Sequence, residues 1–170
     1  PVYSAMPRST LSILSTISES MTALSIHEIT LDQQQHHEEV FPLAYAVEGP
    51  SPELVQVQQW IDENKERLLE QLSRHGAILF RGLPVRSDRD FDSVIQSFGL
   101  NNFTYAESLS NAVRRNRTER VFTANEAPAS VSIFLHHEMA QTPIYPSKLF
   151  FYCEQAAASG GATPLCRSDV

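Results

Sequence analysis

The sequence predicts an α+β fold, and three observations indicate that class. Compact apolar runs that suit strands occur beside two longer segments whose apolar residues recur every three or four positions, as on one face of a helix. Helix, strand, turn and helix follow one another before residue 100. Further apolar runs, separated by proline and glycine, fill the part after residue 130. The length of 170 residues suits one domain, or part of a larger one.

The first 25 residues differ from the rest because Ser and Thr dominate them and charged residues are scarce. We expect residues 1–25 to be a disordered or extraneous tail and residues 26–170 to form the domain. The tail is too polar for the apolar part of a signal peptide. A transit peptide and a natural start at Met21 are the alternatives. The first strands are expected at residues 26–30 and 41–47.

The clearest helix is expected to begin at Ser51, a good N-cap, with Pro52 at the first helical position. It is expected to end at Gly76, after a basic last turn formed by Arg74 and His75. His75 is therefore interpreted as a partner of the helix end rather than a metal ligand. One helical face carries most of the apolar residues, namely Leu54, Val57, Ile61, Leu68 and Leu72, with Trp60 and Leu69 beside it.

A compact buried strand is expected at residues 77–81, and a second helix after Ser87, which is another suitable N-cap. Gly99 is expected to end this helix. Its apolar stripe consists of Phe91, Val94, Ile95 and Phe98. These elements are interpreted as scaffold.

Residues 100–130 show little periodicity and are interpreted as one long loop. Two interpretations stay open, a lid or substrate wall and a mobile surface loop. The basic cluster at residues 114–117 is interpreted as a solvated part of the loop, with anion steering as the alternative. The net charge of −7 argues against a nucleic-acid partner.

Three potential metal ligands end the apolar run Val131–Glu138. Alternate side chains of a strand share a face, so His136 and Glu138 are expected to point the same way and His137 the other. Two histidines and one carboxylate hold Fe(II) in non-haem iron oxygenases, and this pair would supply two of those three ligands. The alternative is a surface ion pair, since a His-x-Glu spacing is common by chance. The same three letters at residues 36–38 follow a glutamine run, so they are interpreted as a solvated polar segment.

Two more strands are expected at residues 148–153 and 162–166, with Gly160-Gly161 as a tight turn between them. A strand, a turn and a strand after a ligand pair suggest the opening of a β-sandwich or jelly roll. Cys153 and Cys166 lie on these runs without metal-type spacing, so we expect buried, reduced thiols in a cytosolic protein. No apolar run approaches the length that a bilayer requires.

Several of these motifs together resemble the Fe(II)/2-oxoglutarate dioxygenases of the taurine dioxygenase family. They are His136-x-Glu138, Pro146-x-x-Leu149-Phe-Phe-Tyr-Cys153 and Gly160-Gly161-x-Thr163-Pro164. The strand at residues 76–82 and the helices on either side of it also resemble that family, so the likeness covers residues 54–168. The version with Glu138 looks most like the branch of syringomycin-biosynthesis-type and clavaminate-synthase-like amino-acid hydroxylases.

The resemblance implies a double-stranded β-helix, or jelly roll, with flanking helices, of which this chain is the N-terminal portion. It implies Fe(II) held by His136 and Glu138, and 2-oxoglutarate as a co-substrate whose carboxylate contacts Thr163. On residue type alone, Thr163 would be an ordinary strand threonine. The family's distal His and its 2-oxoglutarate-binding Arg are expected beyond Val170, so we expect this chain to be incomplete on its own.

Three hypotheses stay open from the sequence. The first is a 2-oxoglutarate-dependent hydroxylase of a small amino-acid-like substrate that is complete only with a C-terminal half. The second is a catalytically incomplete fragment or pseudoenzyme of the same family. The third is an unrelated small α+β binding module with a coincidental His-x-Glu. A small-molecule substrate, without nucleic acid or membrane, is expected under the first.

Overall fold

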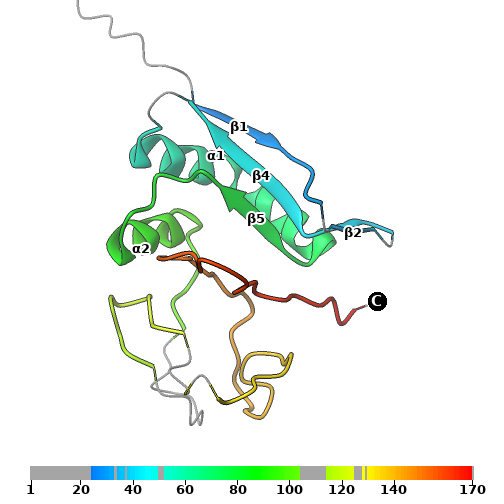
Figure 1. The fold of residues 1–170 in the computed structure, drawn as a ribbon. Helices are drawn as coiled ribbons and strands as arrows, with labels where there is room; N and C mark the ends of the chain where they lie inside the picture. The colour runs from blue at the N-terminus through cyan, green and yellow to red at the C-terminus, as the bar shows by residue number, and fades with distance from the viewer. Residues whose placement is uncertain are drawn as a thin grey trace, which may run out of the picture.

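The computed structural model describes residues 24–32, 34–36, 38–49, 52–103, 114–124, 128 and 130–169. The expected tail and the candidate start at Met21 therefore lie outside the described residues, apart from Leu24 and Ser25. A three-stranded mixed sheet, a separate strand pair and two helices form the regular part of the fold (Figure 1). The predicted α+β class is confirmed. No helix among the described residues has both the length and the apolar character that crossing a bilayer requires.

The larger sheet has the strand order β1–β4–β5, formed by Ser25–Glu28, Leu43–Glu48 and Ile78–Arg81. Strand β1 runs antiparallel to β4, whereas β5 runs parallel to β4. Parallel neighbours need a crossover connection, and α1 at Leu54–His75 supplies it. Leu68 of α1 packs with β4, so the helix covers one face of this sheet.

A second sheet pairs β2 (Gln35–His36) with β3 (Val40–Phe41) in antiparallel register. The second copy of the His-His-Glu letters therefore starts in a two-residue strand. His37 lies outside the described residues, so the interpretation of this copy as a solvated segment stays a prediction.

Helix α1 begins later than the sequence predicts. Its N-cap is Glu53, which forms a capping box with Gln56, and the Glu53 backbone N–H donates to Gln56 Oε1 at 3.0 Å. A capping box satisfies backbone N–H groups that the first helical turn leaves without partners, so it fixes the start. Ser51, the expected cap, lies outside the described residues, and Pro52 precedes the helix.

The end of α1 is where the sequence predicts it. Gly76 has a φ of 74°, a conformation that glycine adopts without a steric penalty, and its N–H donates to Leu72 O at 2.9 Å. The His75 Nδ1 lies 2.9 Å from the carbonyl oxygen of Val40 in β3. This contact joins the end of α1 to β3, and the role of His75 as a partner of the helix end stays a prediction.

Two clusters of buried side chains form the core. Tyr45 stacks on Phe80 with ring centroids 5.6 Å apart, and its hydroxyl donates to Gln71 Oε1 at 2.9 Å. Each fully buried aliphatic side chain contributes about 1.5–3 kcal/mol relative to an exposed one. The first cluster contains Leu43, Tyr45 and Leu68, and the second, between the helices, contains Val57, Ile61 and Val94.

Helix α2 (Asp88–Ser97) carries the fold toward the remaining chain. Ser87 is its N-cap, as predicted, and its side chain accepts from the Asp90 N–H at 3.1 Å. Val94 packs against α1, which fixes the position of α2 relative to the sheet. The surface that α2 turns away from α1 is then available to the segments that follow.

The predicted strands at residues 131–138, 148–153 and 162–166 are wrong, because the described residues form no strand there. A strand needs a neighbouring backbone to pair with, and no described strand pairs with these segments. Apolar side chains on them stay exposed, including Phe134 at 82% and Phe151 at 74%. In Figure 1 this part, yellow through orange to red, runs as irregular chain. The jelly roll is not confirmed.

Cys153 and Cys166 are free thiols, but they are exposed rather than buried as predicted.

Candidate metal centre

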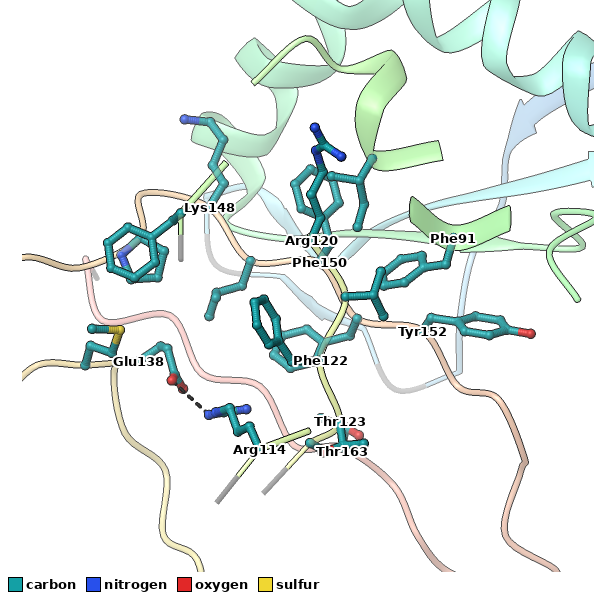
Figure 2. Close-up of a pocket in the computed structure, with 18 of the residues that line it drawn as sticks. Phe91, Arg114, Arg120, Phe122, Thr123, Glu138, Lys148, Phe150, Tyr152 and Thr163 are labelled. Carbon is teal, nitrogen blue, oxygen red and sulfur yellow. Dashed lines mark hydrogen bonds and ion pairs between the residues drawn. The ribbon is translucent and has the colours of Figure 1, made fainter. Parts of the chain in front are cut away.

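A large cleft of about 1930 Å³ lies between α2 and the irregular segments that follow it (Figure 2). Aromatic side chains from separate segments line it, including Phe91, Phe122 and Phe150. All three residues that the sequence singles out line this cleft as well: His136, Glu138 and Thr163. The cleft therefore brings the predicted site residues into one space.

The residues 114–124, here called the arginine wall, form one side of the cleft. A bridge between Asn116 and Phe122 closes the wall into a tight turn. Arg117 Nε donates to Asp88 Oδ2 at 2.9 Å and Arg120 Nη1 to Asp92 Oδ1 at 3.4 Å, which ties the wall to α2. The hydrogen bond from Arg117 holds the pKa of the Asp88 carboxyl below its ordinary value. This part of the long loop lines the cleft, and its role as a lid or substrate wall stays a prediction.

Aromatic contacts hold the segment at residues 148–152 against α2 although no strand forms there. The rings of Phe91 and Tyr152 have centroids 5.4 Å apart, and those of Phe98 and Phe150 are 5.2 Å apart. The Tyr152 hydroxyl also donates to the carbonyl oxygen of Val85 at 3.1 Å. Aromatic pairs at these distances contribute about 0.5–1.5 kcal/mol beyond their buried area.

His136 and Glu138 lie side by side, with His136 Nε2 3.9 Å from Glu138 Oε2. The His136 Nδ1 is 2.7 Å from the carbonyl oxygen of Phe134. A carbonyl only accepts hydrogen bonds, so Nδ1 is the donor in this contact and Nε2 is the ring nitrogen nearer to Glu138. His137 turns elsewhere, and its Nε2 is 2.7 Å from Ser168 Oγ. The predicted relative directions of these three side chains are confirmed without a strand to enforce them.

A tight turn follows Glu138 directly. Met139 has a φ of 58°, which is uncommon for a residue other than glycine, and its side chain is 3% exposed. The N–H of the buried Thr142 donates to Met139 O at 3.0 Å, and the Thr142 hydroxyl donates to the same oxygen at 2.9 Å. Burial and hydrogen bonding thus keep Met139 in a strained conformation that fixes where Glu138 lies.

The donor atoms of His136 and Glu138 suit a divalent metal ion. Imidazole and carboxylate ligands lie about 2.0–2.2 Å from a metal such as zinc, so two donors can share one ion when they are less than about 4.2 Å apart. The observed 3.9 Å lies within this outer limit, which only a linear arrangement of the two ligands reaches. Adjacent ligands at right angles, as in an octahedral site, lie about 3 Å apart, so the two side chains would have to move closer together to share one ion. The described residues contain no group of three or more His, Cys, Asp or Glu that could complete the site. Their role as iron ligands stays a prediction.

Arg114 is the member of the site that the sequence interpretation missed. Its Nη2 donates to Glu138 Oε1 at 2.9 Å, and its side chain is only 18% exposed. The prediction that residues 114–117 form a solvated cluster is therefore wrong for Arg114. No local sequence signal marks it, because a separation of 24 residues between the two partners has no meaning before the fold is known. In Figure 2, Arg114 lies between Glu138 and Thr163.

Comparison with known proteins places the chain in a family. Residues 39–168 match the model of the family described as taurine catabolism dioxygenase TauD, TfdA. A clavaminate synthase-like protein of Arabidopsis thaliana is 40% identical over 156 residues, which cover 88% of this chain and 47% of the relative. The dapdiamide synthesis protein DdaC of Enterobacter agglomerans is 36% identical over 96 residues, 56% of this chain and 29% of that protein. The chain thus spans about half the length of the first relative and less of the second. It belongs to the TauD, TfdA family of dioxygenases.

Proposed function

We propose that the chain is part of an Fe(II)- and 2-oxoglutarate-dependent dioxygenase that hydroxylates a small amino-acid-like substrate. The observation that carries this proposal is the pair His136 and Glu138, whose donor atoms lie 3.9 Å apart in the cleft of a TauD-family chain. The family assignment removes the third hypothesis, an unrelated binding module. The names of the two relatives, one clavaminate synthase-like and one acting in dapdiamide synthesis, support a substrate of the amino-acid type.

In the proposed reaction the chain's own residues hold and orient the reactants. His136 Nε2 and Glu138 Oε2 would bind Fe(II). The Thr163 hydroxyl, which lines the same cleft, would donate a hydrogen bond to a carboxylate oxygen of 2-oxoglutarate. Bound iron, with 2-oxoglutarate and O₂, supplies the oxidising power for attack on a C–H bond, and the protein supplies positioning. Phe122 and Phe150 would exclude water from the cleft.

We also propose that the full fold is a jelly roll to which this chain contributes the N-terminal part. Large apolar side chains at 50% exposure or more on residues 131–165 support this, because a folded protein seldom exposes so many of them on one stretch. Additional strands beside these segments would pair their backbones and cover those side chains. The third iron ligand and the arginine that binds 2-oxoglutarate would come from that further polypeptide. The cytosolic location also remains a proposal.

The test is metal binding by single variants of the chain. We expect Ala in place of His136 or Glu138 to weaken Fe(II) binding, measured by anaerobic calorimetry. His137→Ala is the matched control, because His137 is adjacent in sequence but turns toward Ser168. Equal affinity of wild type and His136→Ala would remove the metal site. For the co-substrate, Thr163→Val should weaken binding of 2-oxoglutarate to the metal-loaded protein, whereas Thr30→Val, outside the cleft lining, should not.

A further inference from the structure

We propose that Arg114 is a positioning residue that fixes the carboxylate of Glu138 for metal binding. The two oxygens of Glu138 have different neighbours. Arg114 Nη2 donates to Oε1 at 2.9 Å, whereas Oε2 lies 3.9 Å from Nε2 of His136 (Figure 2). The guanidinium therefore holds one oxygen and directs the other toward the second ligand. The inference rests on the proposed function, because it takes Glu138 to be an iron ligand.

The free rotation of a glutamate carboxylate is the reason that such a partner matters. Rotation about the last side-chain bond of Glu has broad, shallow minima, so the carboxylate alone has no preferred orientation. A charged hydrogen bond to one oxygen selects a single orientation. The side chains of Arg114 and Glu138 are only 18% and 14% exposed, so water screens this pair weakly. Hydrogen-bond partners of metal-binding carboxylates typically change metal affinity by about 10–100-fold when they are removed.

Two other arginines of the arginine wall contact α2 instead of Glu138. Arg117 and Arg120 pair with Asp88 and Asp92 of α2, and these contacts attach the wall to the helix. Arg114, at the start of the same segment, instead donates to Glu138. The wall is thus bound to α2 at one end and to a candidate metal ligand at the other.

Charge repulsion predicts the opposite change in metal affinity when Arg114 is removed. A guanidinium near a divalent cation repels it, so Arg114 could instead compete with the metal for Glu138. In that case removal of Arg114 would tighten metal binding. If Arg114 positions Glu138, removal weakens metal binding, because the carboxylate loses its orientation. The direction of the change therefore decides between the two roles.

The experiment measures Co(II) binding to the full 170-residue chain by calorimetry and by the absorption of the bound ion. We expect Arg114→Met to weaken Co(II) affinity about tenfold or more. Arg74→Met is the control, because Arg74 also pairs with a glutamate, Glu39, but does not line the cleft. We expect it to leave the affinity within about twofold of wild type. Arg114→Lys, which keeps the charge but not the planar fork, should fall between wild type and Arg114→Met.

Unchanged or tighter Co(II) binding in Arg114→Met would overturn the inference. If that variant does not fold, Arg114→Lys decides in the same way, since unchanged affinity would overturn it. A metal-free double-mutant cycle adds a second readout: after Glu138→Gln, the further change Arg114→Met should shift the urea midpoint less than it does in wild type. Equal shifts in both backgrounds would contradict the pairing. His136→Ala in the same series separates the two proposals. If His136→Ala leaves the Co(II) affinity unchanged, the proposed function fails. If His136→Ala weakens Co(II) binding and Arg114→Met does not, only the role of Arg114 is refuted.

Discussion

Two valines of α1 allow a matched test of how the helix is held. Val57 is fully buried between α1 and α2, at 0% exposure, whereas Val55 is 61% exposed two residues earlier. Both lie in the same helix, so Val→Ala changes the intrinsic helix preference equally at the two positions. The difference in the free energy of unfolding between the two variants therefore measures the packing of α1 on α2. This packing positions α2, which lines the cleft that contains the candidate metal centre.

The expected size follows from the atoms removed. Val→Ala deletes the equivalent of two methylene groups, each worth about 0.8 kcal/mol when buried. The cavity left behind adds to this, so Val57→Ala should lower the free energy of unfolding by about 2–3 kcal/mol. Val55→Ala removes little buried area and gains a few tenths of a kcal/mol in helix preference, so its net effect should lie within about 0.5 kcal/mol of zero.

Urea unfolding followed by circular dichroism measures both variants. The midpoint should fall for Val57→Ala at an unchanged slope, since the surface exposed on unfolding is nearly the same. The melting temperature should fall by roughly 4–12 °C for a chain of this size. Equal midpoints for Val57→Ala and Val55→Ala would refute the packing of α1 on α2 described above.

Three further predictions concern the helix start, a turn and an ion pair. Ser87→Ala removes the N-cap hydrogen bond of α2 and should lower the free energy of unfolding by about 1 kcal/mol in urea titrations. Gly82→Ala should destabilise more than Gly99→Ala in thermal melts: both have positive φ, but a Cβ at residue 82 would lie 2.8 Å from a β4 carbonyl oxygen, whereas residue 99 has open space. Because Arg117 lowers the pKa of Asp88 below 3.8, the stability from this pair is complete above that pH and is lost as the pH falls through the lower folded value. The difference in urea midpoint between wild type and Asp88→Asn should therefore shrink as the pH is lowered from neutral to about 2.5, and a constant difference would contradict this.

Local sequence signals predicted the first half of the fold closely. The apolar face of α1, its end at Gly76 and the Ser87 cap of α2 all follow from short-range chemistry that a few neighbouring residues decide. The start of α1 was missed because a Glu53–Gln56 capping box outcompetes a Ser-Pro signal only two residues away. The strand predictions after residue 130 were wrong, because a strand depends on a partner that may be far along the chain and apolar runs alone do not supply one.

The sequence by itself determined the helices, the α+β class, the family likeness and the pair His136 and Glu138, since each depends on residues that are close together in the chain. Only the tertiary structure decided that the arginine wall lines the same cleft and that Arg114 holds the carboxylate of Glu138. Nothing in the spacing of those two residues indicates a contact. They meet because α2, packed on α1 through Val94 and bound to the wall by ion pairs, brings the wall to the segment that carries Glu138.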